Sequence, residues 1–199
     1  MKTQIEIIKE YIPLDAFSEV ENLLKKYPIS IVVVAQRRTK HGDFRRFSDG
    51  KVQITINKTL NPHQFLLTLI HEIAHYVVYL NYKNVKPHGK EWKQTFQHLM
   101  LPFLKPEIYP DSILSPLANY LKNPKASTDS DINLSLALKN KTKNSQKNFI
   151  FELSFGSEFQ YQNRNFIVEN KKRKRLVCIE IQTKKRFLFN PLVEVEFVK

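Results

Sequence analysis

The sequence predicts an α+β protein in two parts: helices with a small antiparallel sheet, followed by a small all-β, barrel-like module. Three observations predict this. A long apolar helix is expected at residues 62–82. Short runs rich in β-branched and aromatic residues fill residues 149–199. Between the two parts, residues 122–148 are rich in Lys, Asn, Ser and Thr, as is typical of a polar linker. We therefore expect a first domain over residues 1–121, a basic linker over 122–148 and a β module over 149–199.

The N-terminal third is expected to contain two helices and two strands. Residues 3–12 and 14–27 read as helical, with Pro13 separating them and Pro28 ending the second. Residues 29–35 are a β-branched run, and residues 52–56 alternate apolar with polar side chains. Both runs are predicted strands, and we expect them to pair across the loop between them.

That loop, residues 36–51, is strongly basic. Phe44 and Phe47 are interleaved with its cations, a mixture suited to phosphate contact and base stacking. A solvated loop anchored by two aromatic rings explains the same residues equally well. Both interpretations stay open, and the candidate nucleic-acid contacts here are Arg37, Arg38, Arg45 and Arg46.

The helix predicted at residues 62–82 carries the most informative motif in the chain. Asn61 can cap this helix, and Pro62 suits its first position. Inside it stands His71-Glu72-Ile73-Ala74-His75. Histidines at this spacing lie on one helical face and can bind one tetrahedral Zn²⁺, while the glutamate can act as a general base on water. Polar residues in so apolar a helix need partners, and a metal ion supplies one.

A zinc enzyme site usually has three protein ligands, so a third ligand is expected downstream. Pro87-His88-Gly89 marks a turn, after which a second helix is predicted to run to about Met100. A returning helix can bring His88 back to the first pair, so His88 is the predicted third ligand. Glu91 and His98 are the alternatives, although a solvated helix face explains both at least as well.

The two motifs together resemble the SprT family of zinc metalloproteases, which includes Spartan. The resemblance is carried by residues 71–75 and by Pro87-His88-Gly89-Lys90-Glu91-Trp92. It extends to a β-hairpin at residues 38–45 and 53–57 and to residues 123–127, and so covers roughly residues 1–130. It implies a zincin-like fold and a DNA-associated protease that digests proteins, including those crosslinked to DNA. It also implies one Zn²⁺ bound by His71, His75 and His88, with Glu72 as the catalytic residue.

The chain departs from the family in its C-terminal part. Many members carry a zinc ribbon made of two cysteine pairs, whereas this chain has only Cys178, so we expect no second zinc site. The resemblance is therefore to a bacterial branch that lacks the ribbon. A single cysteine also excludes an internal disulfide and fits a reducing cytosol. Because the N-terminal residues carry charges where an export signal needs an apolar run, we expect a cytoplasmic protein that can associate with the nucleoid.

The remaining segments are predicted from shorter patterns. Prolines interrupt the chain after Met100, a short helix is expected at residues 115–121, and the linker contains an apolar patch that predicts another short helix. Six strands are predicted in the β module, at residues 149–153, 159–161, 166–168, 176–181, 186–189 and 193–198. In the last of these, Val193, Val195 and Phe197 are expected to share one face.

Five consecutive cations stand between two of the predicted strands, where they form a basic hairpin tip. Such a tip can contact a nucleic-acid backbone, or it can be a solvated turn. Its residues are Lys171, Lys172, Arg173, Lys174 and Arg175.

The formal net charge of +13 favours nucleic acid as a partner, with DNA preferred through the resemblance, although a merely soluble basic protein is the alternative. We expect a zinc-dependent protease that acts on proteins bound to nucleic acid, without a membrane association. The competing interpretation is a non-catalytic, zinc-stabilised nucleic-acid adaptor. Glu72 favours the enzyme, because a purely structural site gains nothing from a carboxylate beside an open metal position. The cleavage preference and the oligomeric state stay open.

Overall fold

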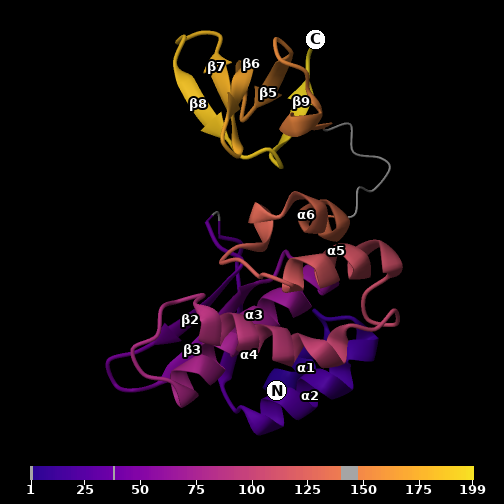
Figure 1. Ribbon diagram of the computed structural model, residues 1–199, viewed down its shortest axis with the longest axis vertical. Coiled ribbons are helices and arrows are strands. Elements are labelled where there is room, and N and C mark those ends of the chain that lie inside the picture. The colour runs from indigo at the N-terminus through magenta and orange to yellow at the C-terminus, as the bar shows by residue number, and fades with distance from the viewer. Residues whose placement is uncertain (1, 38, 140–147) are drawn as a thin grey trace. The chain divides into compact units, whose positions relative to one another are not determined.

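Helices and two separate β-sheets make up the chain, so the predicted α+β class is confirmed (Figure 1). The computed structural model describes residues 2–37, 39–139 and 148–199. The chain divides into two units, Met1–Thr128 and Asp129–Lys199. The first unit holds the helices α1 to α5 and a three-stranded sheet, and the second holds α6 and a six-stranded sheet.

The helix α3 (Pro62–Asn81) forms the core of the first unit. Pro62 lies in its first turn, and the side chain of Asn61 accepts a hydrogen bond from the Gln64 N–H at 3.0 Å, so the predicted cap is confirmed. α3 packs against α4 (Lys90–Met100) and against the strands β2 (Gly42–Arg46) and β3 (Val52–Asn57). Because α3 is covered on both sides, thirteen of its residues are buried, including His71 and Glu72.

The other helices agree with the prediction in type but differ in extent. α1 (Gln4–Lys9) is shorter than expected, and a short 3-10 turn at Leu14–Ala16 precedes α2 (Phe17–Lys26). α5 (Asp111–Leu121) begins before the expected residue 115 and accommodates Pro116 within it. The short helix expected in the linker is present as α6 (Ile132–Leu138), while residues 140–147 of the predicted linker lie outside the described residues.

The first sheet has the strand order β1-β3-β2 and corrects two predictions. β1 (Ser30–Val34) and β3 (Val52–Asn57) pair as predicted, but in parallel, so the sheet is mixed rather than antiparallel. The predicted loop at residues 36–51 contains the strand β2 (Gly42–Arg46), which pairs antiparallel with β3. β3 is the central strand, with β1 on one side of it and β2 on the other. The β2–β3 hairpin that the resemblance implies is present.

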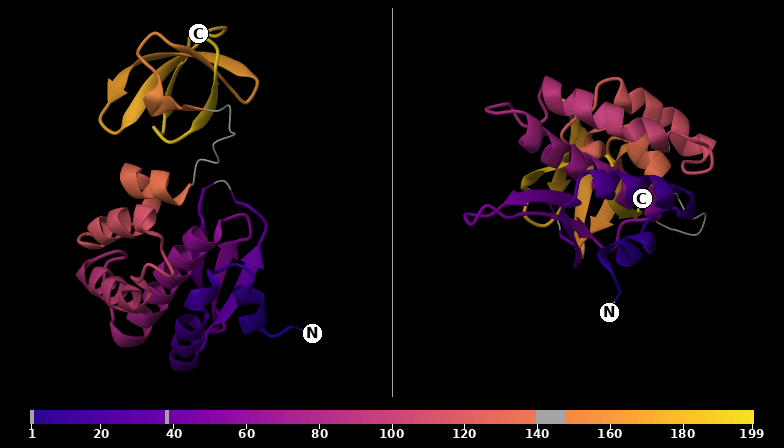
Figure 2. Two further views of the ribbon diagram at one scale, coloured as in Figure 1. Left: turned by 90° about the vertical axis from the view of Figure 1, so that its right-hand side faces the viewer. Right: turned by 90° about the horizontal axis from the view of Figure 1, so that it is seen from below.

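The second sheet, coloured orange to yellow in Figure 2, has the order β4-β9-β5-β6-β7-β8. Every neighbouring pair in it is antiparallel. Its strands are β4 (Asn148–Phe149), β5 (Glu158–Tyr161), β6 (Arg164–Lys172), β7 (Arg175–Glu180), β8 (Arg186–Phe189) and β9 (Glu194–Phe197). The predicted barrel is wrong: within the described residues the sheet is open, with β4 and β8 at its edges. β4 has only two residues before the chain enters a 3-10 turn at Ile150–Glu152, so it is too short to close the sheet.

The core of the second unit lies on the concave side of this sheet. The rings of Phe159 on β5 and Phe189 on β8 lie 5.5 Å apart although two strands, β6 and β7, separate β5 from β8 in the sheet order, so the sheet is strongly curved. Cys178 is fully buried in this core, and burial raises the pKa of its thiol to about 12, which makes it a packing residue. Val195 on β9 is buried in this core, whereas Phe197, two residues further along the same strand, is 52% exposed.

The predicted basic hairpin tip lies between β6 and β7. Lys172 pairs with Arg175, and the two residues between them form the turn, with Arg173 at a φ of 56°. All five side chains of the tip are exposed. Among the residues that the structure describes, no helix is long and apolar enough to cross a membrane.

Candidate metal centre

Three histidine rings converge on one point in the first unit. Nε2 of His88 lies 2.9 Å from Nε2 of His75 and 3.2 Å from Nε2 of His71. Tetrahedral zinc with bonds of about 2.0–2.1 Å requires ligand nitrogens about 3.3 Å apart, so this triangle fits one ion with small adjustments. The structure therefore brings together the three predicted metal ligands as a cluster that can hold a metal ion.

His71 and His75 reach this point from successive turns of α3, whereas His88 reaches it from a β-turn. The Gly89 N–H donates to the Lys86 carbonyl at 2.9 Å, and His88 has a φ of 56°. Pro87 fixes its own φ near −65°, so these features define a type II turn with His88 at the position that needs a positive φ. A Cβ on Gly89 would lie 2.9 Å from the Lys86 oxygen, and glycine is therefore required there. The turn aims His88 back at α3.

Trp92 packs against all three imidazoles. Its ring centroid lies 4.6 Å from those of His71 and His88 and 5.3 Å from that of His75, and its side chain is buried. Burial lowers the pKa of all three imidazoles, that of His75 to about 4. The rings are consequently neutral at pH 7, which is the form that binds a metal ion.

Glu72 lies next to the histidine cluster and is only 7% exposed. The backbone N–H of Phe44 on β2 donates a hydrogen bond to its carboxylate. Burial, and then the nearby charge of Asp43, raise the pKa of the Glu72 carboxyl to about 8, against the opposing effects of Arg37 and Lys40. A cation held by the three histidines would favour the ionised carboxylate, which is the form that can accept a proton.

The strand β2 approaches Glu72 at a glycine. A Cβ on Gly42 would lie 2.8 Å from Oε1 of Glu72 and 2.6 Å from Cγ2 of Thr68. Neither Gly42 nor the packing role of Trp92 was predicted. Gly42 stands inside the loop predicted at residues 36–51, where a glycine gives no signal of a close approach.

A cleft of about 580 Å³ opens in front of the cluster. His71, Glu72, His75 and His88 all line this cleft. Its rim is aromatic and basic: Tyr79 and Tyr82 are exposed, and the Arg46 guanidinium lies over the Tyr79 ring at 5.4 Å. The cluster is thus open to a ligand of considerable size.

The two alternative ligands, Glu91 and His98, lie on α4 and do not take part in the histidine cluster that the described residues form.

Tyr109 is fully buried, and its hydroxyl donates to the His63 carbonyl at 3.3 Å, so it is a packing residue. Burial also raises the pKa of Tyr109 above its ordinary value.

The predicted nucleic-acid contacts of the first unit have different surroundings. Arg45 is exposed and pairs with Asp43, and Arg46 is exposed at the cleft rim. Arg37 is half-buried and bonded within the protein, while Arg38 lies outside the described residues. The hairpin tip belongs to the other unit, and nucleic-acid binding stays a prediction.

Comparisons with known proteins support the family resemblance. Residues 17–109 match the profile of the SprT-like family. Protein SprT of Actinobacillus succinogenes is 47% identical over 47 residues, which are 22% of this chain and 28% of that protein. Protein SprT of Vibrio parahaemolyticus is 49% identical over 45 residues, which are 21% of this chain and 27% of that protein. The chain thus spans little more than a quarter of the length of these curated relatives. No solved structure matches.

The matched region contains every part of the site described above. It includes Gly42 on β2, the motif on α3 and the turn that carries His88. Residues 17–109, just under half of the chain, therefore match the SprT-like family and carry the whole of this site.

Proposed function

We propose that this protein is a zinc-dependent protease of SprT type, with a zincin-like catalytic unit, that acts on proteins associated with nucleic acid, including proteins crosslinked to DNA. One observation carries the enzymatic part of the proposal. A buried carboxylate, Glu72, lies beside three converging imidazoles on the wall of an open cleft. A site whose only task was to hold a metal would need neither that carboxylate nor the cleft.

The donor set favours zinc. Three neutral imidazole nitrogens without a thiolate suit Zn²⁺, and three protein ligands leave one tetrahedral position open. In that setting the ion supplies Lewis-acid activation of water and of a peptide carbonyl. His71, His75 and His88 would hold the metal, and the packing of Trp92 against all three rings keeps them in place.

Glu72 would move the proton in this reaction. Its carboxylate accepts a proton from the attacking water and then delivers it to the leaving amine nitrogen. The Phe44 N–H orients the carboxylate, and Gly42 leaves the space in which it lies. A group with these restraints is pre-organised for proton transfer, because it need not be ordered during the reaction.

The substrate would bind as an extended segment along β2. This strand is at the edge of the sheet order β1-β3-β2, and Gly42, Asp43, Phe44 and Arg46 line the cleft. An edge strand can pair with an extended peptide through main-chain hydrogen bonds, which bind a backbone without selecting its sequence. Such binding suits a protease that must accept many different proteins.

The preference for substrates on nucleic acid rests on charge. The chain has a formal net charge of +13, and its exposed cations include the whole hairpin tip at residues 171–175. Binding to DNA would raise the local concentration of proteins that are bound to the same DNA.

The decisive experiment compares the full chain with its Glu72→Gln variant on a DNA-bound protein. The amide keeps the shape of the side chain but cannot accept the proton, so both proteins should hold one zinc ion while the variant loses cleavage by about 10²-fold or more. Glu91→Gln, on α4, is the matched control and should leave cleavage intact. Cleavage by Glu72→Gln at the wild-type rate would refute the mechanism. A wild-type chain that holds zinc, binds DNA and cleaves no protein would instead be an adaptor.

A further inference from the structure

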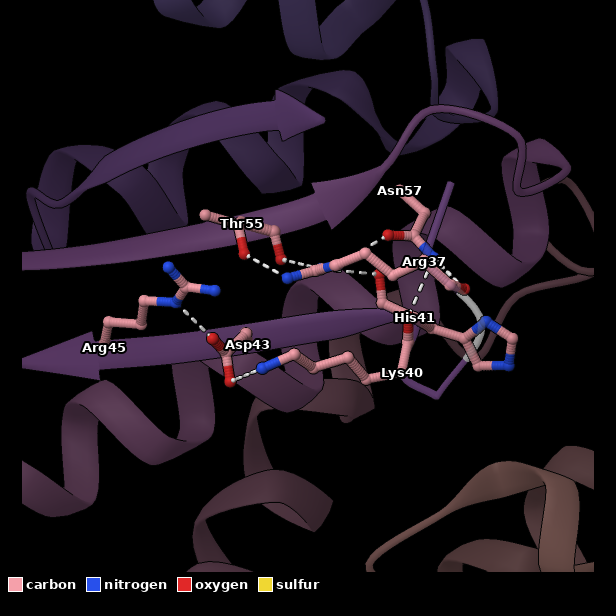
Figure 3. Close-up of polar contacts among 7 residues, drawn as sticks. All are labelled: Arg37, Lys40, His41, Asp43, Arg45, Thr55 and Asn57. Atoms are coloured by element: carbon pink, nitrogen blue, oxygen red, sulfur yellow. Dashed lines mark hydrogen bonds and ion pairs between the residues drawn. The ribbon is translucent and has the colours of Figure 1, made fainter. Parts of the chain in front are cut away.

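The guanidinium of Arg37 is bonded to the sheet from several directions (Figure 3). Its Nε donates to Oδ1 of Asn57 at 2.9 Å, and one terminal nitrogen donates to Oγ1 of Thr55 at 2.9 Å. The other terminal nitrogen donates to the Thr55 carbonyl at 3.3 Å and lies 3.5 Å from the His41 carbonyl. Thr55 and Asn57 are both buried on β3. All three guanidinium nitrogens of Arg37 therefore donate hydrogen bonds within the protein. A side chain bonded in this way has little capacity left to bind a phosphate.

Asn57 continues this network to the residues just before β2. Its side-chain amide donates to the Lys40 carbonyl at 2.8 Å, and its backbone N–H donates to the His41 carbonyl at 2.9 Å. Two successive carbonyls are thus held by one residue, which Arg37 itself holds in place. Residues 40 and 41, which directly precede β2, are thus hydrogen-bonded to the last residue of β3.

The residue that follows residues 40 and 41 is the one that contacts Glu72. Gly42 follows His41 and pairs with Ile56, and the space in front of its Cα is filled by the Glu72 side chain. Since successive residues of a strand face opposite sides, Thr55 and Asn57 lie on the face away from α3, and Ile54 and Ile56 on the face towards it. Arg37 therefore bonds to residues on the sheet face that points away from α3, whereas Glu72 contacts Gly42 on the face that points towards α3.

We infer that Arg37 is a positioning residue for Glu72: it fixes the entry of β2, and β2 fixes the carboxylate through Gly42 and the Phe44 N–H. This inference deepens the proposed protease function and rests on it for its catalytic consequence. It replaces the nucleic-acid role that the sequence suggests for this one arginine. The side chains of Lys40 and Arg45 pair instead with Asp43 on β2 (Figure 3).

The test measures kcat, KM and zinc content of Arg37→Lys and Arg37→Ala in the full chain. A lysine keeps the charge but cannot reach Thr55 and Asn57 together, so kcat should fall about 10- to 100-fold, as misplacement of a catalytic group by about an ångström does. Zinc should stay at one per chain, because the histidines lie on α3 and in the turn before α4 and not on β2. KM should change less than kcat, because the test displaces the entry of β2 and the carboxylate that rests on it rather than the whole cleft. Added guanidinium, at concentrations far below denaturing ones, should restore part of kcat in Arg37→Ala and have no effect on Arg37→Lys. The matched control is Lys51→Ala, an exposed cation in the turn before β3.

A second readout needs no proteolysis and separates this inference from the proposed function. The Phe44 amide, which bonds to Glu72, should exchange its hydrogen faster in both Arg37 variants, while the amides within α3 keep their protection. If the wild type cleaves nothing, this exchange result still supports or overturns the role of Arg37. Unchanged kcat and unchanged Phe44 exchange would overturn it. So would a parallel loss of zinc and kcat, or a loss of DNA affinity in Arg37→Lys with cleavage of free protein intact.

Discussion

Gly42 and Glu72 fit against each other so closely that a Cβ on Gly42 would lie 2.8 Å from the glutamate Oε1. Real Cβ atoms do not approach other atoms within 3.0 Å, so any larger residue would have to displace the carboxylate or the strand. The glycine thus sets the distance between an edge strand and the helix that carries the metal motif. The site therefore needs glycine at position 42, because every other residue type has a Cβ there.

Gly42→Ala should therefore impair proton transfer without removing the metal. We expect kcat to fall about 10²-fold, because the carboxylate must shift, and the free energy of unfolding to fall by about 1–3 kcal/mol from overpacking. Zinc content, kcat and a denaturant midpoint measure the two effects. Gly50→Ala, in the turn between β2 and β3, is the control for kcat: a Cβ there meets nothing within 4 Å, so kcat should stay at the wild-type level, whereas the φ of 83° lowers stability in its own right. A Gly42→Ala enzyme with wild-type kcat would show that the clash is relieved elsewhere.

His88→Ala should lower zinc affinity and cleavage together. Two histidines alone leave the ion under-coordinated, so the Kd for zinc should rise by more than about 100-fold, the upper limit for loss of an outer-shell partner. Competition with a chelator measures the affinity. His98→Ala is the control on α4, and an equal loss of zinc in that variant would mean that the third ligand is wrongly assigned.

The stability of the second unit should depend on pH through Glu180. Hydrogen bonds from Arg164 and Thr183 lower the pKa of this carboxyl from an ordinary value of 4.5 to about 2. Between these pH values the unfolded chain binds a proton that the folded unit does not, so stability falls as pH decreases from about 4.5 to about 2. Hydrogen-exchange protection of the β7 amides measures this loss.

Glu180→Gln should remove most of that pH dependence, because an amide has no proton to gain. Glu194→Gln, a change of the same kind on the exposed side of β9, is the control and should leave the dependence as it is in the wild type. Protection that falls equally in Glu180→Gln would assign the effect to other carboxyl groups.

Replacing the five cations of the hairpin tip by serine should weaken the salt dependence of DNA binding. At about 0.9 counterions per phosphate contact, loss of three contacts flattens the plot of log K against log salt by about 2 to 3 units. Cleavage of a free, unstructured protein should be spared. The control removes the same number of exposed cations from the first unit, namely Lys9, Lys25, Lys26, Lys51 and Lys58. An unchanged slope would make the tip a solvated turn, and a slope that changes only when Arg45 and Arg46 are replaced would place the DNA at the cleft.

The helices and the histidine cluster could be predicted because their signals are local. Asn61 and Pro62 mark the start of α3, an apolar run gives its length, and the spacing of His71 and His75 places both on one face. Pro87 and Gly89 likewise mark the turn that presents His88. Each of these features is determined by residues within a few positions of one another.

The features that could not be predicted from the sequence depend on pairing between segments that are separate in the chain. Gly42-Asp43-Phe44-Arg45-Arg46 contains no β-branched residue and resembles a basic loop, yet it becomes a strand because β3 offers it a partner. The parallel pairing of β1 with β3 and the open edge of the second sheet depend on the same kind of long-range contact. The roles of Gly42 and Arg37 follow from that pairing, so no reading of the loop by itself could find them.

The short span of the histidine cluster also bears on the order of folding. Its outermost members, His71 and His88, are only seventeen positions apart and lie on a helix and the turn that follows its end. Loops of this length close at low entropic cost, and local contacts form early. The β2–β3 hairpin is more local still, since Arg46 pairs with Val52 and Gly42 with Ile56, and it lies upstream of the helix. A nascent chain can consequently complete this hairpin before residue 88 is made, so the strand that restrains Glu72 is available when the three histidines come together.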